Sequence, residues 1–410
     1  MEARPPRAGR TELAAWRLAT LCFTLAALTG AFMRFGMYLG LPWGLQLGDV
    51  RHAHSHLMFF SWVTPALALA MHAALLQAGR RLPGGASVAV AAALAGLAAY
   101  VPFLLSGYRL LPVGDRELPL SMMLSAVNGI VWYVLVLLYL AGSWRLRRTP
   151  ALRLMDGAAA MLVVSTLGVL LLMADGLGGT STPSRVAANA EFFLTLFADG
   201  WFGLSLLGAL AAMRFQTGTM GGCGRATWAL AAGLCLRSGA RLAAEHGMTS
   251  LRWLEGIGGL LAAAAWLWLV LALWRSDDAP GDAAGRTLAR IALGLVALKS
   301  AVEVALALPA GEAFVEREGL RVLFLHAYLL GAVSLGLVSF GRGRFGPAAW
   351  RGAGTFAVAV AVLVALLLPL TGLWPAGLAG FWALPAAALS SLGPVLLGAY
   401  ALVSGRAAAR

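Results

Sequence analysis

The sequence predicts an all-α membrane protein in which about twelve helices form a polytopic bundle. Two properties of the composition support this prediction: 60% of the 410 residues are hydrophobic and only 12% are charged. A soluble domain of this length needs a larger share of charged surface. The third observation is a series of apolar windows of roughly 20 residues, the length that crosses a bilayer core. These windows begin near residues 13, 53, 86, 120, 152, 189, 226, 252, 287, 320, 352 and 376.

The arginines between these windows indicate which ends of the spans face the cytoplasm. If the N-terminus is inside, the segments on the inner side hold most of the loop arginines, which is typical of cytoplasmic loops. We therefore expect cytoplasmic termini and a single transmembrane domain, residues 1–410, in the plasma membrane of a prokaryote. The net charge of +13 comes from scattered arginines and not from a basic patch, so we expect membrane lipid, and no nucleic acid, as a partner.

Three of the six histidines fall at the start of the second span, in RHAHSHLMFFSW. Residues four apart share a helix face and residues two apart point away from each other, so His52 and His56 share a face that His54 opposes. One ion therefore cannot bind all three if the helix is already formed at Arg51. The histidines either cap the helix start in the aqueous interface or bind a ligand. A small ion such as copper or zinc would favour the His52 and His56 face.

A further histidine, His326, lies early in the tenth span, LRVLFLHAYLLGAVSLGLVSF. The second and tenth spans both enter from the outside in the predicted topology, which places His326 about 9 Å into the membrane. An imidazole in hydrocarbon loses its hydrogen bonds unless it finds a partner, so intramembrane histidines are candidates for function. Two histidine sites at matched depth predict a shared ligand, such as a haem iron that takes one imidazole from each of two helices.

A twelve-span core with these two histidine positions resembles subunit I of the haem–copper oxidases, the superfamily that includes the nitric oxide reductases. The resemblance implies one haem b, held by His54 or His56 from the second span, with His54 the closer match, and by His326 from the tenth. Because these histidines lie toward the outer face, we also expect a redox partner there. The functions it implies are respiratory electron transfer, nitric oxide handling or redox sensing.

The same family binds copper through histidines on the sixth and seventh spans, and here the sequence departs from the pattern. The sixth span, NAEFFLTLFADGWFGLSLLGAL, has no histidine, and the seventh has only His246 near its end. We therefore expect neither copper nor a haem–copper oxygen-reducing centre, and we assign no catalytic residue.

Charged residues inside the predicted spans form a second group of candidates. A lone charge there costs at least ~2.5 kcal/mol, so we expect Asp199 to pair with Arg237 and Lys299 to pair with Glu303 one turn away. Lys299 is the only lysine in the chain. Lysine loses its proton when desolvated whereas arginine stays charged, so the network predicts either a structural strut or a proton relay.

Two arginines are candidates to hold haem propionates through charge-assisted hydrogen bonds. Arg51 directly precedes the histidine triplet, and Arg241 lies near the outer end of the seventh span. Two other functions stay open for the chain as a whole. It is either a transporter that moves a metal or small ion past the charged network, or an accessory subunit without a cofactor.

Overall fold

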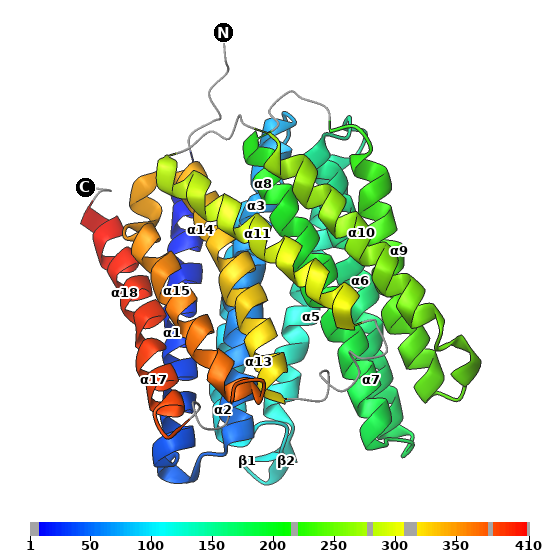
Figure 1. Cartoon of the computed structure of the whole chain (residues 1–410), viewed down its shortest axis with the longest axis vertical. Coiled ribbons are helices and arrows are strands. Elements are labelled where there is room, and N and C mark those ends of the chain that lie inside the picture. Colours follow the sequence, from blue (N-terminus) through cyan, green and yellow to red (C-terminus); the bar gives the residue numbers. More distant parts are fainter. Residues whose placement is uncertain (1–7, 215–219, 277–281, 307–317, 376–379, 408–410) are drawn as a thin grey trace.

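The computed structural model describes residues 8–214, 220–276, 282–306, 318–375 and 380–407, and it confirms the predicted all-α bundle (Figure 1). In this part of the chain, ten helices are long and apolar enough to cross a membrane, as expected of a multi-pass membrane protein. The first helix begins and the last helix ends at the same end of the bundle (Figure 1). This is the end that the arginines predict to be cytoplasmic, and we call the opposite end the outer end.

The first half of the chain supplies six spans, of which the second and sixth are rods with a π-helical middle. These spans are α1 (Arg10–Leu39), α2 (Leu47–His56) with η2 (Leu57–Val63) and α3 (Thr64–Gln77), α4 (Ala86–Ser106), α5 (Leu120–Ser143), α6 (Pro150–Leu177), and α7 (Pro183–Leu194) with η3 (Thr195–Gly203) and α8 (Leu204–Arg214). A short 3₁₀ turn, η1 (Pro42–Gly44), precedes α2, and a hairpin of β1 (Leu111–Val113) and β2 (Arg116–Leu118) joins α4 to α5.

The second half supplies the other six spans, and the tenth is again a rod with a π-helical middle. They are α9 (Cys223–Glu245), α10 (Leu254–Trp274), α11 (Ala283–Leu306), α13 (Glu318–Leu325) with η6 (His326–Ser334) and α14 (Leu335–Phe345), α15 (Ala353–Leu367) with η8 (Leu368–Thr371), and α17 (Ala383–Ser390) with α18 (Leu392–Ala407). Short 3₁₀ turns, η4 (Thr249–Leu251) and η7 (Pro347–Trp350), precede α10 and α15.

Two of the predicted spans, α9 and α11, fall outside the ten strongly apolar helices. They are 23 and 24 residues long and lie in the same bundle as the others (Figure 1). Charged residues interrupt their apolar sequence, and three of these, Arg237, Lys299 and Glu303, belong to the network described below.

The second span begins at Leu47, six residues earlier than residue 53. The first turn of this span carries Asp49, which pairs with Arg109 at 2.5 Å. A search for apolar windows does not include such a polar turn, so it places the start of the helix too late. The last span begins at Ala383, and residues 376–379, where its predicted start falls, lie outside the described residues.

The second, sixth and tenth spans form the centre of the bundle. Their most apolar stretches are 89%, 78% and 61% buried, whereas no other helix among the ten exceeds 50%. Their π-helical segments touch one another. The Phe59 and Phe197 rings join the second span to the sixth at 6.3 Å, and the Tyr328 hydroxyl of the tenth donates to the Ala198 carbonyl of the sixth at 2.9 Å. The second span contacts the tenth through the Trp62 indole, which donates to the Ser334 hydroxyl at 3.1 Å.

Nearby side chains explain two of the three π-helical segments, η2 and η6. Pro65 has no N–H for the Ser61 carbonyl four residues earlier, which loosens the helix at η2. The Thr64 hydroxyl donates to the Phe59 carbonyl, five residues back, at 2.8 Å, and Ser334 does the same to Leu329 at 2.9 Å in η6. Such π segments often mark functional positions in helices.

Candidate functional site

The histidine triplet lies within a formed helix, so its members face different neighbours. His56 points toward the third and fourth spans, where its ring stacks on Phe103 at 3.8 Å. Its Nδ1 donates to the His52 carbonyl at 2.9 Å, and its Nε2 lies 3.2 Å from the Ser125 hydroxyl. Both nitrogens of His56 therefore have protein partners.

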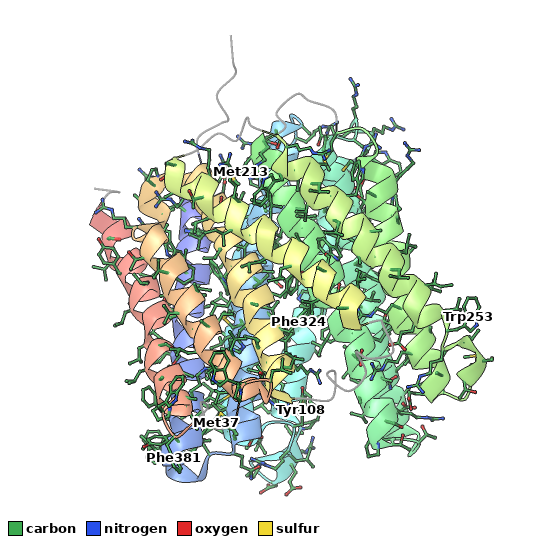
Figure 2. All side chains as sticks on the ribbon, viewed as in Figure 1. Met37, Tyr108, Met213, Trp253, Phe324 and Phe381 are labelled. Atoms are coloured by element: carbon green, nitrogen blue, oxygen red, sulfur yellow. The ribbon has the colours of Figure 1, made fainter. Side chains whose placement is uncertain are left out.

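His52 lies at the mouth of the same face, with the Tyr108 ring edge-on at 4.7 Å. Tyr108 follows the third span, near the outer end of the bundle (Figure 2), and burial raises the pKa of its hydroxyl. Tyr108 is thus neutral, and its ring packs against His52 without adding a charge beside it.

His54 points the opposite way, toward α1. Its Nδ1 donates to the Ala26 carbonyl at 2.8 Å, which fixes the tautomer and leaves the Nε2 lone pair available. Gly30 makes this approach possible, because a Cβ at that position would lie 2.9 Å from Cε1 of the imidazole. The backbone of α1 therefore positions the His54 ring.

His326 is held in the same tautomer on the tenth span. Its Nδ1 donates to the Val322 carbonyl at 2.7 Å, and its Nε2 lies 3.0 Å from a guanidinium nitrogen of Arg34. Because arginine only donates, Nε2 carries a lone pair directed at a cation. The two predicted imidazoles both contact α1, His54 at Ala26 and Gly30 and His326 at Arg34.

Arg34 is the residue of this site that the sequence analysis missed. Its side chain is 5% exposed, and no carboxylate among the described residues lies within 4 Å of it. It follows Ala26 and Gly30 at four-residue spacing, so all three share one face of α1. That spacing is the sequence signal that could have found it. We call His54, His326, Gly30 and Arg34 the imidazole site.

The two arginines expected to hold propionates differ in their surroundings. Arg51 is exposed and acts electrostatically on His52. Arg241 pairs with Glu191 of the sixth span at 3.1 Å and lies 3.8 Å from Glu255 of the eighth. Carboxylates of neighbouring spans thus bind Arg241, and the propionate role of both arginines stays a prediction.

The buried charges form a second cluster between the sixth, seventh and ninth spans. Lys299 lies 2.8 Å from Glu303, which confirms that pairing, and 3.1 Å from Asp199. The predicted pairing of Asp199 with Arg237 is wrong, since Arg237 binds Glu303 at 3.0 Å. We call these four residues the ionic cluster; fully ionised, it carries no net charge.

Aromatic rings enclose the lysine of the ionic cluster. The Lys299 Nζ lies 5.0 Å from the Tyr328 ring centroid, 5.7 Å from that of Phe324 and 5.9 Å from that of Trp266, within cation–π range. Phe324 lies deeper in the bundle than Tyr108 (Figure 2). Gly203 of the sixth span leaves room for the Trp266 ring, because a Cβ at position 203 would lie 2.3 Å from that ring. The tenth span thus contributes to both sites, with His326 in one and Tyr328 in the other.

Comparison with known proteins gives no family to which these sites can be assigned: no protein-family model matches the chain, and no curated protein matches it significantly. Within the described ranges, no three histidine, cysteine, aspartate or glutamate side chains converge as ligands for a metal ion.

Proposed function

We propose that this protein binds one haem b through His54 and His326 and transfers electrons, as a divergent relative of haem–copper oxidase subunit I. The observation that supports the proposal is the pair of imidazoles from two central spans. Each donates its Nδ1–H to a backbone carbonyl and keeps Nε2 as a lone pair. That is the protonation state that iron ligands require.

One further feature of the imidazole site fits a haem. Arg34 is buried with no carboxylate beside it in the part of the chain that the structure describes, and the propionates of haem would supply a counter-charge. The Arg34 guanidinium donates to the His326 lone pair, so it would have to release this nitrogen for iron to bind.

A bound haem would supply one-electron chemistry in this site. The chain's own residues hold the ligands for it: the Ala26 and Val322 carbonyls fix the two tautomers, and Gly30 provides space for the His54 ring. The proposal includes no copper centre. The family binds copper through histidines on its sixth and seventh spans, whereas here the sixth span has no histidine and the seventh has only His246 near its end.

The proposed functions are respiratory electron transfer, nitric oxide handling or redox sensing. Because the histidines lie toward the outer end of the bundle, a redox partner would dock there. We place the protein in the plasma membrane of a prokaryote, where proteins of this type work.

The test is a dithionite-reduced minus oxidised visible spectrum of the purified protein. We expect the sharp band of a six-coordinate haem b, and we expect His54→Ala and His326→Ala each to lose it. Matched controls on the same helix are His52→Ala and His56→Ala, whose side chains face Tyr108, Phe103 and Ser125; both should keep the band.

A flat spectrum from folded wild-type protein would refute the haem proposal. The accessory-subunit and transporter alternatives would then take its place. Loss of the band in His56→Ala but not in His54→Ala would move the ligand to the other face of the second span.

A further inference from the structure

The ionic cluster has two acids in unequal surroundings. Oε1 of Glu303 is shared by two cations, Lys299 at 2.8 Å and Arg237 at 3.0 Å. Among the described residues, the cation that pairs with Asp199 is Lys299, at the longer distance of 3.1 Å. An opposite charge favours the ionised form of an acid and burial disfavours it, so Asp199 is the less strongly held anion of the two.

All charged groups that act on Asp199 come from the neighbouring spans. They are Lys299 and Glu303 on the ninth span and Arg237 on the seventh, and the neutral Tyr328 hydroxyl of the tenth contacts the carbonyl of the preceding residue, Ala198. Addition of one proton to Asp199 changes the cluster from neutral to a charge of +1. The cations stay in place because Glu303 continues to bind both of them.

A series of charged side chains links the cluster to the outer end. The exposed fraction of the side chains rises from 2% at Lys299 and 5% at Glu303 to 30% at Arg237 and 39% at Arg241. Arg241 follows Arg237 by one helical turn and binds Glu191, which is 33% exposed. The charge density therefore continues from the buried lysine to the membrane surface.

Charged side chains do not continue in the opposite direction. On the three spans that build the cluster, the next charged residues toward the inner end are Arg214, Arg225 and Arg290. Even the nearest in sequence, Arg290, is nine residues from Lys299, about 13 Å along the helix. On these spans the run of charged side chains therefore extends from the cluster toward the outer side.

A second feature indicates hydration beside the lysine. The Trp266 ring lies against Lys299, yet its fully buried indole N–H has no partner in the described protein. Buried polar groups of this kind are commonly satisfied by ordered water, and water is what a proton needs to reach a buried acid.

We propose that Asp199 is a proton-accepting site, at which the ionic cluster takes up one proton from the outer side of the membrane. The proton passes from water along the Arg241 and Arg237 side and forms an O–H bond on the Asp199 carboxylate. No electron moves and no other bond breaks. Because the site involves no haem, this proposal stands independently of the proposed function.

The single lysine makes the test specific. Protein grown with lysine labelled with carbon-13 at Cε gives one side-chain resonance, that of Lys299. We expect this resonance to shift in one step as the pH is lowered through the range in which the protein stays folded, because the neighbouring carboxylate loses its charge. In Asp199→Asn, which mimics the protonated acid, the step should be absent.

Two more variants keep the test decisive if Asp199→Asn does not fold. Glu303→Gln leaves Asp199 facing two cations, so the midpoint should move to lower pH by about one unit or more. The matched control Glu255→Gln removes a carboxylate near Arg241 and should leave the midpoint unchanged. A resonance that stays flat in folded wild-type protein, a step that persists in Asp199→Asn, or a midpoint that ignores Glu303→Gln would overturn the proposal.

Discussion

The imidazole site and the ionic cluster lie on two sides of the same π-helical segment, and they differ in how far the protein satisfies them. In the cluster, each of the four charges has an opposite charge within 3.1 Å. In the imidazole site, the described residues give the buried Arg34 guanidinium a neutral imidazole and no carboxylate. The charges of the cluster are therefore balanced by the protein itself, whereas the proposed haem would supply the counter-charge in the imidazole site. Charge balance distinguishes the two sites more clearly than burial does.

The largest effect should follow from removal of the Lys299 charge from the ionic cluster. Lys299→Met leaves Asp199 without its cation and Glu303 with only Arg237, so we expect the free energy of unfolding to fall by about 3–5 kcal/mol. Thermal unfolding of the purified protein measures it. The double variant Lys299→Met with Asp199→Asn should recover part of the loss, and no recovery would show that the lysine acts through packing alone.

A steric change at the imidazole site should have the next largest effect. Gly30→Ala places a Cβ 2.9 Å from the His54 ring, which must move away from the Ala26 carbonyl. We expect a loss of about 1–3 kcal/mol in unfolding free energy together with a weaker haem band. Gly129→Ala is the matched control, since a Cβ there meets nothing within 4 Å; equal effects of the two substitutions would contradict the role of Gly30.

Arg34→Met should act in the opposite sense to Lys299→Met. Because Arg34 is a buried cation without a carboxylate, its removal should leave the stability of haem-free protein unchanged or raise it. The same substitution should reduce haem retention, measured as haem per protein after purification. A large loss of stability in haem-free Arg34→Met would mean that the protein itself stabilises the Arg34 charge, as it does the charges of the ionic cluster.

The smallest effect concerns an ion pair at the inner end of the bundle, which serves as a reference for both sites. Its acid, Asp282, precedes α11, and Arg342 lies in the last turn of α14. Arg342 donates to Asp282 from Nε at 3.2 Å and lowers the pKa of that carboxyl. An acid with a lowered pKa adds stability above the ordinary value of about 3.9 and loses it as the pH falls through the folded-state pKa. The melting temperature should therefore fall below about pH 4, and less steeply in Asp282→Asn. If the melting temperature falls with pH equally in wild-type protein and in Asp282→Asn, the ion pair of Asp282 does not contribute to acid stability.

Features that depend on one helix at a time could be predicted from the sequence. The windows located the spans, and the period of the helix placed His52 and His56 on one face with His54 opposite. The Lys299 and Glu303 pair also follows from four-residue spacing on a single helix. These predictions depend on geometry that each segment carries by itself.

Partners on different spans could not be predicted in the same way. Asp199 binds Lys299 and not Arg237, and Arg241 binds Glu191 and not a site near the histidines. An apolar window shows that a helix is in the membrane, but it does not show which neighbour the helix contacts or how it is rotated. Arg34 was missed for the same reason, because its partner His326 lies on a different span.

The sequence by itself thus determined a multi-pass helical bundle and the helix faces on which its histidines lie. Only the tertiary structure decided that the second, sixth and tenth spans meet at the centre and that α1 presents a carbonyl, a glycine and an arginine to two imidazoles. The physical reason is that hydrophobicity drives each span into the bilayer without directing it to a partner. Close packing and the pairing of buried polar groups then choose among the possible neighbours.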